Sequence, residues 1–219
     1  MKHPLKILVP FSGSASLLRY LLNKDPNYGK TYETVCGIAN KKDTKGETFC
    51  KENNIPFISL NTKNFCRQHG YEGKLKDMSK HLRHAYYTDL LVLIKFYKPD
   101  IVLLSGFMLE ITEPLISYCP IINVYPADLR IKETATDKPK YTGDDPVTKA
   151  IKDKQTFTAS TVHVVGPELY CGKIICVSEP LFVEEGVLPH HHREEMKMKC
   201  DGPACKKALD LITSGAFVF

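Results

Sequence analysis

The chain has 219 residues, of which 43% are hydrophobic and 25% are charged, and its formal net charge is +5. These values are typical of an ordinary globular protein. No apolar run approaches the roughly 18 residues of a membrane-spanning helix. The lysines are scattered and form no basic block with interleaved aromatic residues, so we expect no nucleic-acid partner and no membrane partner.

The N-terminal segment "MKHPLKILVPFS" reaches polar Ser12 after only a short apolar run. That run is too short for a secretory signal peptide, so we expect a cytoplasmic protein. None of the eight cysteines forms a Cys-x-x-Cys pair, and we interpret them as thiols rather than disulfides. The segment His190–His192, with Cys200 and Cys205, could be interpreted as a metal site. Three adjacent histidines cannot all face one ion, however, so we predict no metal.

The first 125 residues alternate short apolar runs with helical patterns. Strands are predicted at 6–11, 32–40, 55–60, 100–106 and 121–125. Helices are predicted at 14–24, 44–54, 78–98 and 111–119, of which 78–98 is the longest and ends before Pro99. Alternating strands and helices are the pattern of a parallel sheet with right-handed crossovers. Near-continuous apolar strands such as "IVLL" agree, because both faces of such a sheet are covered.

The second half of the chain has a different pattern. Residues 127–146 form a polar loop, and the β-rich runs 156–165 and 173–183 flank a turn at "GPELYCG". We predict that these two runs form an antiparallel pair added to the parallel sheet. A last helix is predicted at about 203–214. With no internal repeat and no clear linker, we expect a single domain over residues 1–219.

The loop after the first strand is a candidate binding site, because ligands of open α/β sheets bind beyond the carboxyl ends of the strands. It contains Ser12, Gly13, Ser14, Ala15 and Ser16. Backbone N–H groups and a helix N-terminus there suit a phosphate, although a serine N-cap needs no ligand. The stretch has neither Gly-x-Gly-x-x-Gly nor the P-loop lysine, so both interpretations stay open.

Two further strand ends could carry chemistry. Gly106, Phe107 and Met108 could form an apolar floor for a flat ring, or could simply pack in the core. Asn123 could donate a hydrogen bond to a carbonyl oxygen on which charge develops, or could bond the local backbone in a turn. His163 lies in the middle of a predicted strand, where we favour a structural histidine with satisfied hydrogen bonds.

Taken in order, six segments resemble the folate-dependent formyltransferase family, in particular its glycinamide ribonucleotide formyltransferases. The segments are "KILVPFSGSAS", "GIANKKD", "KPDIVLLSGFM", "INVYP", "ASTVHVV" and "ELYCGKII", and they run from about residue 5 to 183. The resemblance implies a doubly wound, mostly parallel, Rossmann-like sheet. It also implies formyl transfer from 10-formyltetrahydrofolate, as co-substrate, to the amine of a phosphorylated acceptor.

The resemblance also implies catalytic residues, and two of these differ here. Asn123 matches the family asparagine, and His163 matches a histidine common in that strand. Tyr125 stands where the family has histidine, and Tyr170 stands where it has the aspartate of its late loop. A tyrosine with a pKa near 10 donates hydrogen bonds but is a poor proton shuttle at neutral pH. The loss of both residues should therefore remove most of the family's catalysis and leave the contribution of Asn123.

The binding residues carry over in part. For the acceptor phosphate, the loop keeps Ser12, Gly13 and Ser16 but has Ser14 and Ala15 where the family has asparagine and glycine. In the last helix, a loose alignment gives Lys199 as a further phosphate contact. The folate is expected at these five residues: Gly106, Phe107, Met108, Glu168 and Leu169.

We therefore predict a cytoplasmic formyltransferase of one-carbon metabolism and purine biosynthesis, acting as a monomer or homodimer. Two alternatives stay open. The fold could serve a different acyl or one-carbon acceptor, or it could bind a folate-like ligand without catalysis. A histidine or aspartate within hydrogen-bond distance of Asn123 favours catalysis, whereas Tyr125 and Tyr170 packed together favour binding alone.

Overall fold

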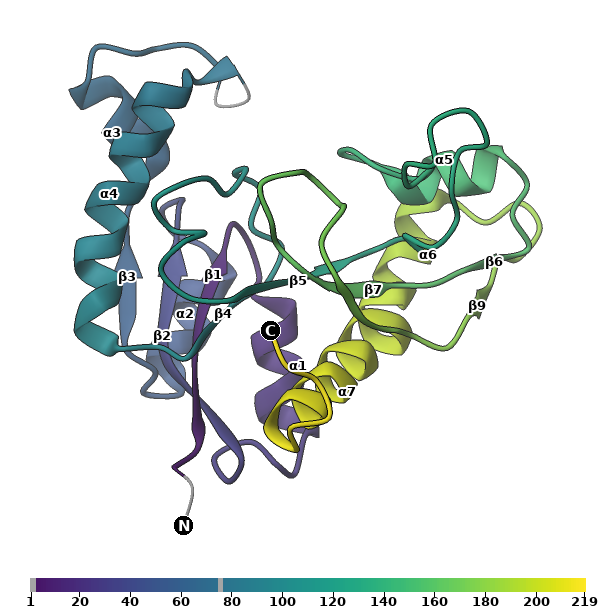
Figure 1. Ribbon diagram of the computed structural model, residues 1–219, viewed down its shortest axis with the longest axis horizontal. Coiled ribbons are helices and arrows are strands. Elements are labelled where there is room, and N and C mark those ends of the chain that lie inside the picture. Colours follow the sequence, from purple (N-terminus) through teal and green to yellow (C-terminus); the bar gives the residue numbers. More distant parts are fainter. Residues whose placement is uncertain (1–2, 75–76) are drawn as a thin grey trace. The chain divides into compact units, whose positions relative to one another are not determined.

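The structure is a computed structural model that describes residues 3–74 and 77–219, in which the chain forms two compact units. Unit 1 comprises Met1–Leu22 and Pro26–Ile121, and unit 2 comprises Asn23–Asp25 and Ile122–Phe219. The strand order is β3-β2-β1-β4-β5-β7-β8 in a seven-stranded sheet, with a separate pair β6-β9 (Figure 1). The single domain over residues 1–219 stays a prediction. The start of the N-terminal segment, residues 1–2, lies outside the described residues.

Unit 1 contains the parallel part of the sheet. Its elements are β1 (Leu5–Phe11), α1 (Ser16–Lys24), β2 (Tyr32–Ala39), α2 (Lys45–Glu52), β3 (Phe57–Ser59), α3 (Thr62–Gln68), α4 (Lys80–Tyr97) and β4 (Ile101–Leu104). β1 pairs in parallel with β2 and with β4, and β2 pairs in parallel with β3. The last five residues of β1 and all four of β4 are buried, as expected for strands covered on both faces. The predicted parallel sheet is confirmed.

Helix α4 is the longest helix, as predicted. The Ser79 hydroxyl accepts a hydrogen bond from the Leu82 N–H at 3.2 Å and caps the start of the helix. At the other end Lys98 has φ +45°, and Pro99 follows it. A left-handed residue followed by proline is a common way to end a helix.

The helix predicted at 111–119 is wrong. Residues 113–118 form turns, in which Leu115 N–H donates to Thr112 O and Tyr118 N–H donates to Leu115 O, each at 3.1 Å. These bonds span three residues rather than four. Pro114 explains the difference, because it lacks an N–H and disfavours helical geometry in the residue before it.

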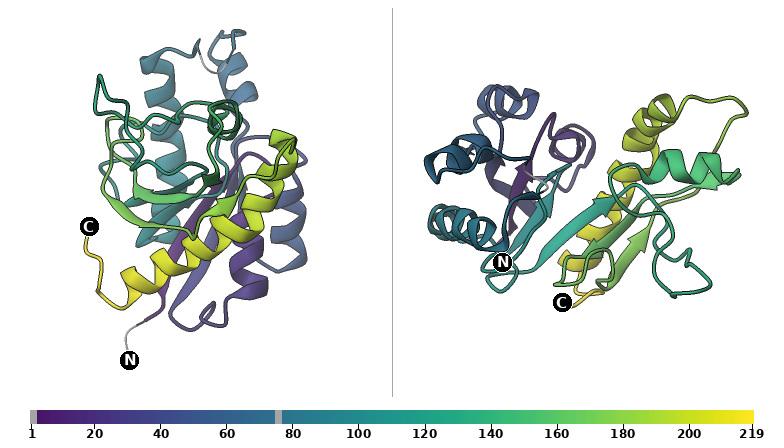
Figure 2. Two further views of the ribbon diagram at one scale, coloured as in Figure 1. Left: turned by 90° about the vertical axis from the view of Figure 1, so that its right-hand side faces the viewer. Right: turned by 90° about the horizontal axis from the view of Figure 1, so that it is seen from above.

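Unit 2 contains the antiparallel part of the sheet. Its elements are β5 (Ile121–Tyr125), α5 (Pro146–Lys152), β6 (Phe157–Thr158), β7 (Thr161–Val164), β8 (Ile174–Val177), β9 (Leu181–Phe182), α6 (Pro189–Met196), the π-helical segment η2 (Lys197–Asp201) and α7 (Gly202–Thr213). β7 pairs antiparallel with β5 and β8, which confirms the predicted antiparallel pair. Helix α7, close to its predicted bounds, packs against β7 and β8 (Figure 2).

Each of the two β-rich runs is two strands rather than one. The first run is interrupted at Ala159 and Ser160, where the Ser160 N–H donates to the Ser178 hydroxyl at 3.0 Å instead of to a strand. β6 precedes the interruption in the first run, and β9 follows the interruption in the second run. These two short strands pair with each other. Helix α5 was not predicted, although Asp145 caps it and Pro146 begins it, which is a recognisable start signal. Among the described residues, no helix is both long and apolar enough to cross a membrane.

Candidate functional site

The loop between β1 and α1, in unit 1, has its carbonyl groups bound to the protein. Gly13 O accepts from the Gly46 N–H at 3.0 Å, and Ser14 O accepts from Arg19 Nε at 2.9 Å. Ala15 O accepts from the Arg19 N–H at 3.0 Å. Within the described part of the chain, the N–H groups of Gly13, Ser14 and Ala15 donate to no acceptor. These free donors, next to the N-terminus of a nine-residue helix, form a suitable anion site.

Arg19 was not predicted as part of this site, and it positions the loop. Besides holding Ser14 O, its guanidinium donates to Lys45 O at 2.9 Å and lies 4.5 Å from the centre of the Phe49 ring. Helix α2 therefore supports the loop through its contacts with Arg19. The position of Arg19, three residues into α1, gave no sequence signal for this role.

Ala15 has φ +51° and is 1% exposed. This is the left-handed region, which glycine enters freely and alanine enters at a cost of about 1–2 kcal/mol. Ala15 therefore keeps the backbone turn that the resemblance associates with glycine. The direction of the loop's free N–H groups depends on this backbone turn, which Arg19 supports by binding Ser14 O.

The exit of β4 is tied to this loop by two serines. The Ser12 hydroxyl accepts from the Met108 N–H at 2.8 Å, and the Ser12 N–H donates to Gly106 O at 3.3 Å. Ser105, which was not predicted, accepts from the Leu17 N–H at 3.1 Å. The predicted phosphate-binding and folate-binding segments of unit 1 are thus neighbours. Met108 is 67% exposed, so it is not the core residue of the alternative interpretation.

In unit 2, Asn123 and His163 are partners on neighbouring strands. They lie opposite each other in the β5–β7 register, and Asn123 Nδ2 lies 3.3 Å from His163 Nε2. His163 Nδ1 lies 3.0 Å from Val164 O. A carbonyl only accepts, so Nδ1 carries the proton, and Nε2 accepts from the Asn123 amide. One amide N–H and the amide oxygen of Asn123 remain available for a ligand.

His163 is 3% exposed, and both of its ring nitrogens are occupied. Burial lowers the pKa of His163 below its ordinary value of 6.5, so the ring is neutral at pH 7. His163 therefore holds the Asn123 amide through Nε2. Gly172 makes room for this arrangement, because a Cβ there would lie 1.7 Å from Val164 O.

Tyr125 and Tyr170 pack together. Their ring centres are 4.7 Å apart with an angle of 48° between the planes, and the Tyr125 hydroxyl donates to Gly143 O at 2.7 Å. Burial raises the pKa of Tyr125 far above its ordinary value of 10, and nearby Tyr170 and Asp144 add to this shift. Tyr125 thus stays protonated at neutral pH, and its proton is already donated to a carbonyl.

Two aspartates of the polar loop, Asp128 and Asp145, bind other groups. Asp128 accepts from Arg130 Nε at 2.9 Å, and Asp145 caps α5 by accepting from the Thr148 N–H at 3.1 Å. Asp144 is exposed and lies near Tyr125. Among the described residues of unit 2, the histidine next to Asn123 is buried, and no aspartate forms a hydrogen bond with this pair.

Comparison with known proteins decides the family. The family profile described as "Formyl transferase" matches residues 5–200.

The chain belongs to the formyl transferase family.

Several named relatives support this assignment. Phosphoribosylglycinamide formyltransferase of Haemophilus influenzae is 25% identical over 185 residues, covering 83% of this chain and 76% of that protein. The Trifunctional purine biosynthetic protein adenosine-3 of Bos taurus is 24% identical over 96% of this chain, which spans only 18% of that longer protein.

Solved structures show the same fold. The glycinamide ribonucleotide transformylase 1 of Symbiobacterium toebii has a TM-score of 0.80 at 20% identity, covering 100% of this chain and 92% of that one. A formyltetrahydrofolate deformylase of Pseudomonas putida has a TM-score of 0.75 at 15% identity, covering 99% and 68%. The predicted formyltransferase fold is confirmed.

The other predicted binding residues of this formyl transferase family member lie on the surface of unit 2. Glu168 pairs with Lys138 at 2.9 Å, and Leu169 is 51% exposed. Lys199 lies on η2 and its ammonium contacts Glu195 at 2.6 Å. The roles of Glu168 and Leu169 toward folate, and of Lys199 toward phosphate, stay predictions.

The histidine-rich segment provides no cluster of ligands. The rings of His190 and His191 lie 4.1 Å apart, whereas buried His192 lies 2.7 Å from the Thr158 hydroxyl. Within residues 3–74 and 77–219, no group of three or more His, Cys, Asp or Glu residues is placed to hold a metal ion. All eight cysteines are free thiols.

Proposed function

We propose that this protein transfers a formyl group from 10-formyltetrahydrofolate to the amine of a small phosphorylated acceptor such as glycinamide ribonucleotide. The observation that carries the proposal is the Asn123 amide, held by neutral His163 with one N–H free. Membership of the formyl transferase family supports it. We further propose a cytoplasmic enzyme of purine biosynthesis, working as a monomer or homodimer.

In this proposal the acceptor amine attacks the formyl carbon, and the carbonyl electron pair moves to oxygen. Asn123 donates its free N–H to this oxyanion, a contribution worth about 10²–10³-fold in rate. The pair then re-forms the carbonyl, the bond from carbon to the folate nitrogen breaks, and that nitrogen takes a proton while the amine loses one. Tyr125 has no proton to give at the oxyanion, so the protons pass through water.

The binding roles follow the same proposal. The free N–H groups of Gly13, Ser14 and Ala15, in the loop Ser12–Ser16, hold the acceptor phosphate. Lys199 stays the further phosphate contact that the resemblance predicts. In unit 1 we propose folate contacts at Gly106, Phe107 and Met108. The contacts of Glu168 and Leu169 with folate stay predictions of the resemblance. Tyr125 and Tyr170 form an aromatic wall in place of the proton-transferring pair.

The test is to incubate the purified protein with 10-formyltetrahydrofolate and either glycinamide ribonucleotide or its unphosphorylated riboside. Formylated product is measured by mass spectrometry. We expect product from the ribonucleotide, with a KM at least about tenfold lower than for the riboside, because a phosphate at a helix N-terminus makes several charge-assisted hydrogen bonds. Equal use of both acceptors would contradict the role of the loop.

One observation favours a second candidate, a protein that binds its ligands without transfer. The packed rings of Tyr125 and Tyr170 stand where the resemblance expects the proton-transferring residues. In that case folate and ribonucleotide bind, as measured by calorimetry, but neither this acceptor nor another amine is formylated. Product from a different amine only would instead indicate another one-carbon acceptor.

A further inference from the structure

Helix α4 has an apolar outer face that the rest of the described chain leaves exposed. Its inner face is buried and includes Leu90 and Ile94. On the outer face Phe96 is 81% exposed and Val92 is 69% exposed, and the two lie four residues apart, on neighbouring turns of the helix. Leu93, beside them, is 39% exposed. We call Val92, Leu93 and Phe96 the α4 face.

The side chains of the α4 face are neighbours, because residues three and four positions apart meet on the surface of a helix. Single exposed apolar side chains are common on proteins and need no partner. A group of three large ones, opposite the buried side of the same helix, is typical of a surface that binds another protein. The α4 face is therefore a candidate protein contact.

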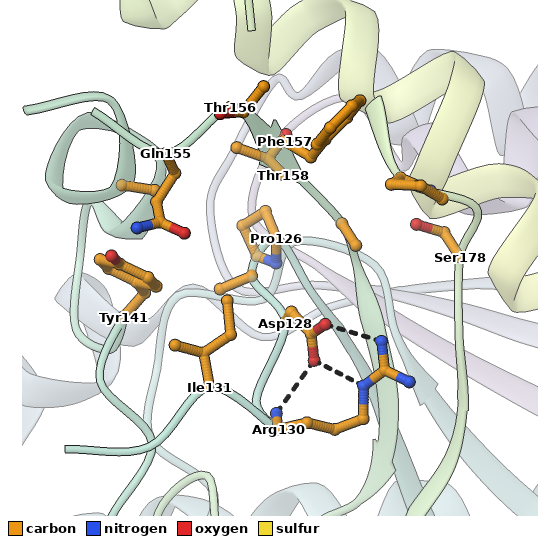
Figure 3. A pocket seen from close by; sticks show the side chains of 14 residues that line it. Pro126, Asp128, Arg130, Ile131, Tyr141, Gln155, Thr156, Phe157, Thr158 and Ser178 are labelled. Carbon is orange, nitrogen blue, oxygen red and sulfur yellow. Dashed lines mark hydrogen bonds and ion pairs between the residues drawn. The ribbon is translucent and has the colours of Figure 1, made fainter. Parts of the chain in front are cut away.

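Two exposed charges of opposite sign flank the α4 face. Asp89 precedes it by three residues, and Lys98 follows it by two, at the C-terminal cap of the helix. In the part of the chain that the structure describes, neither side chain takes part in an ion pair or a hydrogen bond. In unit 2, by contrast, Asp128 and Arg130 neutralise each other within the chain (Figure 3). Asp89 and Lys98 are thus each available to a charge on a partner.

This order of charges, negative before the apolar group and positive after it, is complementary to itself when the direction of the helix is reversed. We propose that the α4 face binds the α4 face of a second copy of this chain, with the two helices antiparallel about a two-fold axis. Residue numbers then rise along one helix as they fall along the other. An alignment that places Phe96 against Val92 of the second copy brings Asp89 within one residue of the second copy's Lys98. A parallel pair would instead bring like charges together.

The proposed contact is small. Stable dimers bury about 800 Å² on each partner, which is more than three side chains supply. The dimer is therefore reversible and depends on protein concentration. In sedimentation velocity the full chain changes from monomer to dimer between about 1 µM and about 100 µM. All samples contain a reducing agent, since the exposed thiol of Cys171 can link two copies covalently.

An exchange of charges tests the antiparallel arrangement. Asp89→Lys and Lys98→Asp, each in a separate protein, bring like charges together at both ends of the contact and weaken self-association at least about tenfold. A one-to-one mixture of the two variants restores opposite charges at both ends, so they form a heterodimer about as readily as the parent forms its dimer. Aspartate suits position 98 sterically, because this residue has φ +45°.

A matched pair of variants tests the apolar part of the contact. Val92→Gln weakens the dimer at least about tenfold, because the two-fold axis removes the side chain from both halves of the contact. Val218→Gln, at a valine of 70% exposure outside α4, leaves it unchanged.

Three results would overturn the proposal. The first is a parent that stays monomeric over the whole concentration range. The second is a dimer that Val92→Gln, or either charge variant alone, leaves intact. The third is a mixture of the two charge variants that stays monomeric although both proteins melt like the parent. None of these readouts depends on formyl transfer.

Discussion

The loop after β1 and the end of β5 both differ from the pattern that the resemblance implies, but with different consequences. In the loop, Ala15 takes the left-handed backbone of a glycine, and the N–H groups of Gly13, Ser14 and Ala15 stay free. At the end of β5, Tyr125 packs against Tyr170, and burial raises the pKa of Tyr125 so that it keeps its proton at neutral pH. A site built from backbone groups tolerates a change of residue type, whereas proton transfer depends on the side chain itself.

The largest expected effect is at Gly172, on which the Asn123–His163 arrangement depends. A Cβ there would lie 1.7 Å from Val164 O, so Gly172→Ala must displace the carbonyl that fixes His163. We expect a loss of at least about 3 kcal/mol in the free energy of unfolding, measured with urea. Gly166→Ala is the matched control, because a Cβ there meets no atom within 4 Å.

The next prediction removes the difference at the two tyrosines and measures the effect on formyl transfer. The double variant Tyr125→His with Tyr170→Asp introduces the residues that the resemblance implies for the family. Aspartate tolerates the φ of +63° at position 170 better than tyrosine. We expect formyl transfer to rise by about 10–100-fold, the lower part of the range for acid–base catalysis. The single variants should gain much less. Equal rates in the parent and the double variant would show that the tyrosines do not limit transfer.

Alkaline pH should weaken unit 1 through its buried thiols. Burial raises the pKa of Cys36 to about 12 and that of Cys50 to about 11, from 9.0. The folded chain then holds protons that the unfolded chain loses, so this stability is complete below pH 9 and falls as pH rises from 9 toward 11–12. The free energy of unfolding should drop by up to about 1.4 kcal/mol per pH unit for each thiol.

The control for this pH dependence is in the same chain. A variant with Cys36→Ala and Cys50→Ala should lose less stability between pH 9 and 10.5, whereas Cys171→Ala, an exposed thiol, should match the parent. Parallel curves for all three proteins would contradict the assignment.

The smallest expected effect is at Ala15, and it tests whether the loop is defined by its backbone. Ala15→Gly relieves about 1–2 kcal/mol of left-handed strain. Two effects of the substitution oppose this gain. Loss of a buried methyl group destabilises the folded state by about 0.8 kcal/mol, and the greater entropy of the unfolded chain with glycine destabilises it by about 0.4–1 kcal/mol. These changes nearly cancel, so the unfolding free energy should shift by less than about 1 kcal/mol. Ala15→Val, with a branched side chain at φ +51°, should clearly destabilise the chain.

Much of the fold followed from local sequence patterns. The apolar runs of β1 and β4 and the periodicity of α4 depend on neighbouring residues, and these elements were predicted. The helix at 111–119 failed because Pro114 outweighed an apparent helical rhythm. Each β-rich run was divided by a contact from a distant segment, Ser160 with Ser178, which no local pattern reveals.

The candidate site was predictable where residue type alone suggests a role. Asn123 and His163 were named from the sequence, but their pairing depends on the register of two strands 40 residues apart. Arg19 and Ser105 were not predicted, because the side chain of each binds a backbone group and no sequence motif marks such a contact. Gly172 had only the weak signal of a glycine in a turn.

The most direct test of the account is the rate of acceptor-dependent folate release from 10-formyltetrahydrofolate, comparing the parent with Asn123→Ala. Glycinamide ribonucleotide is the acceptor, and both proteins are first shown to be folded by their thermal melts. The account predicts measurable release by the parent and a loss of about 10²–10³-fold in kcat for the variant, because the oxyanion loses its donor. Equal rates in the two proteins, or no release by the folded parent, would contradict it.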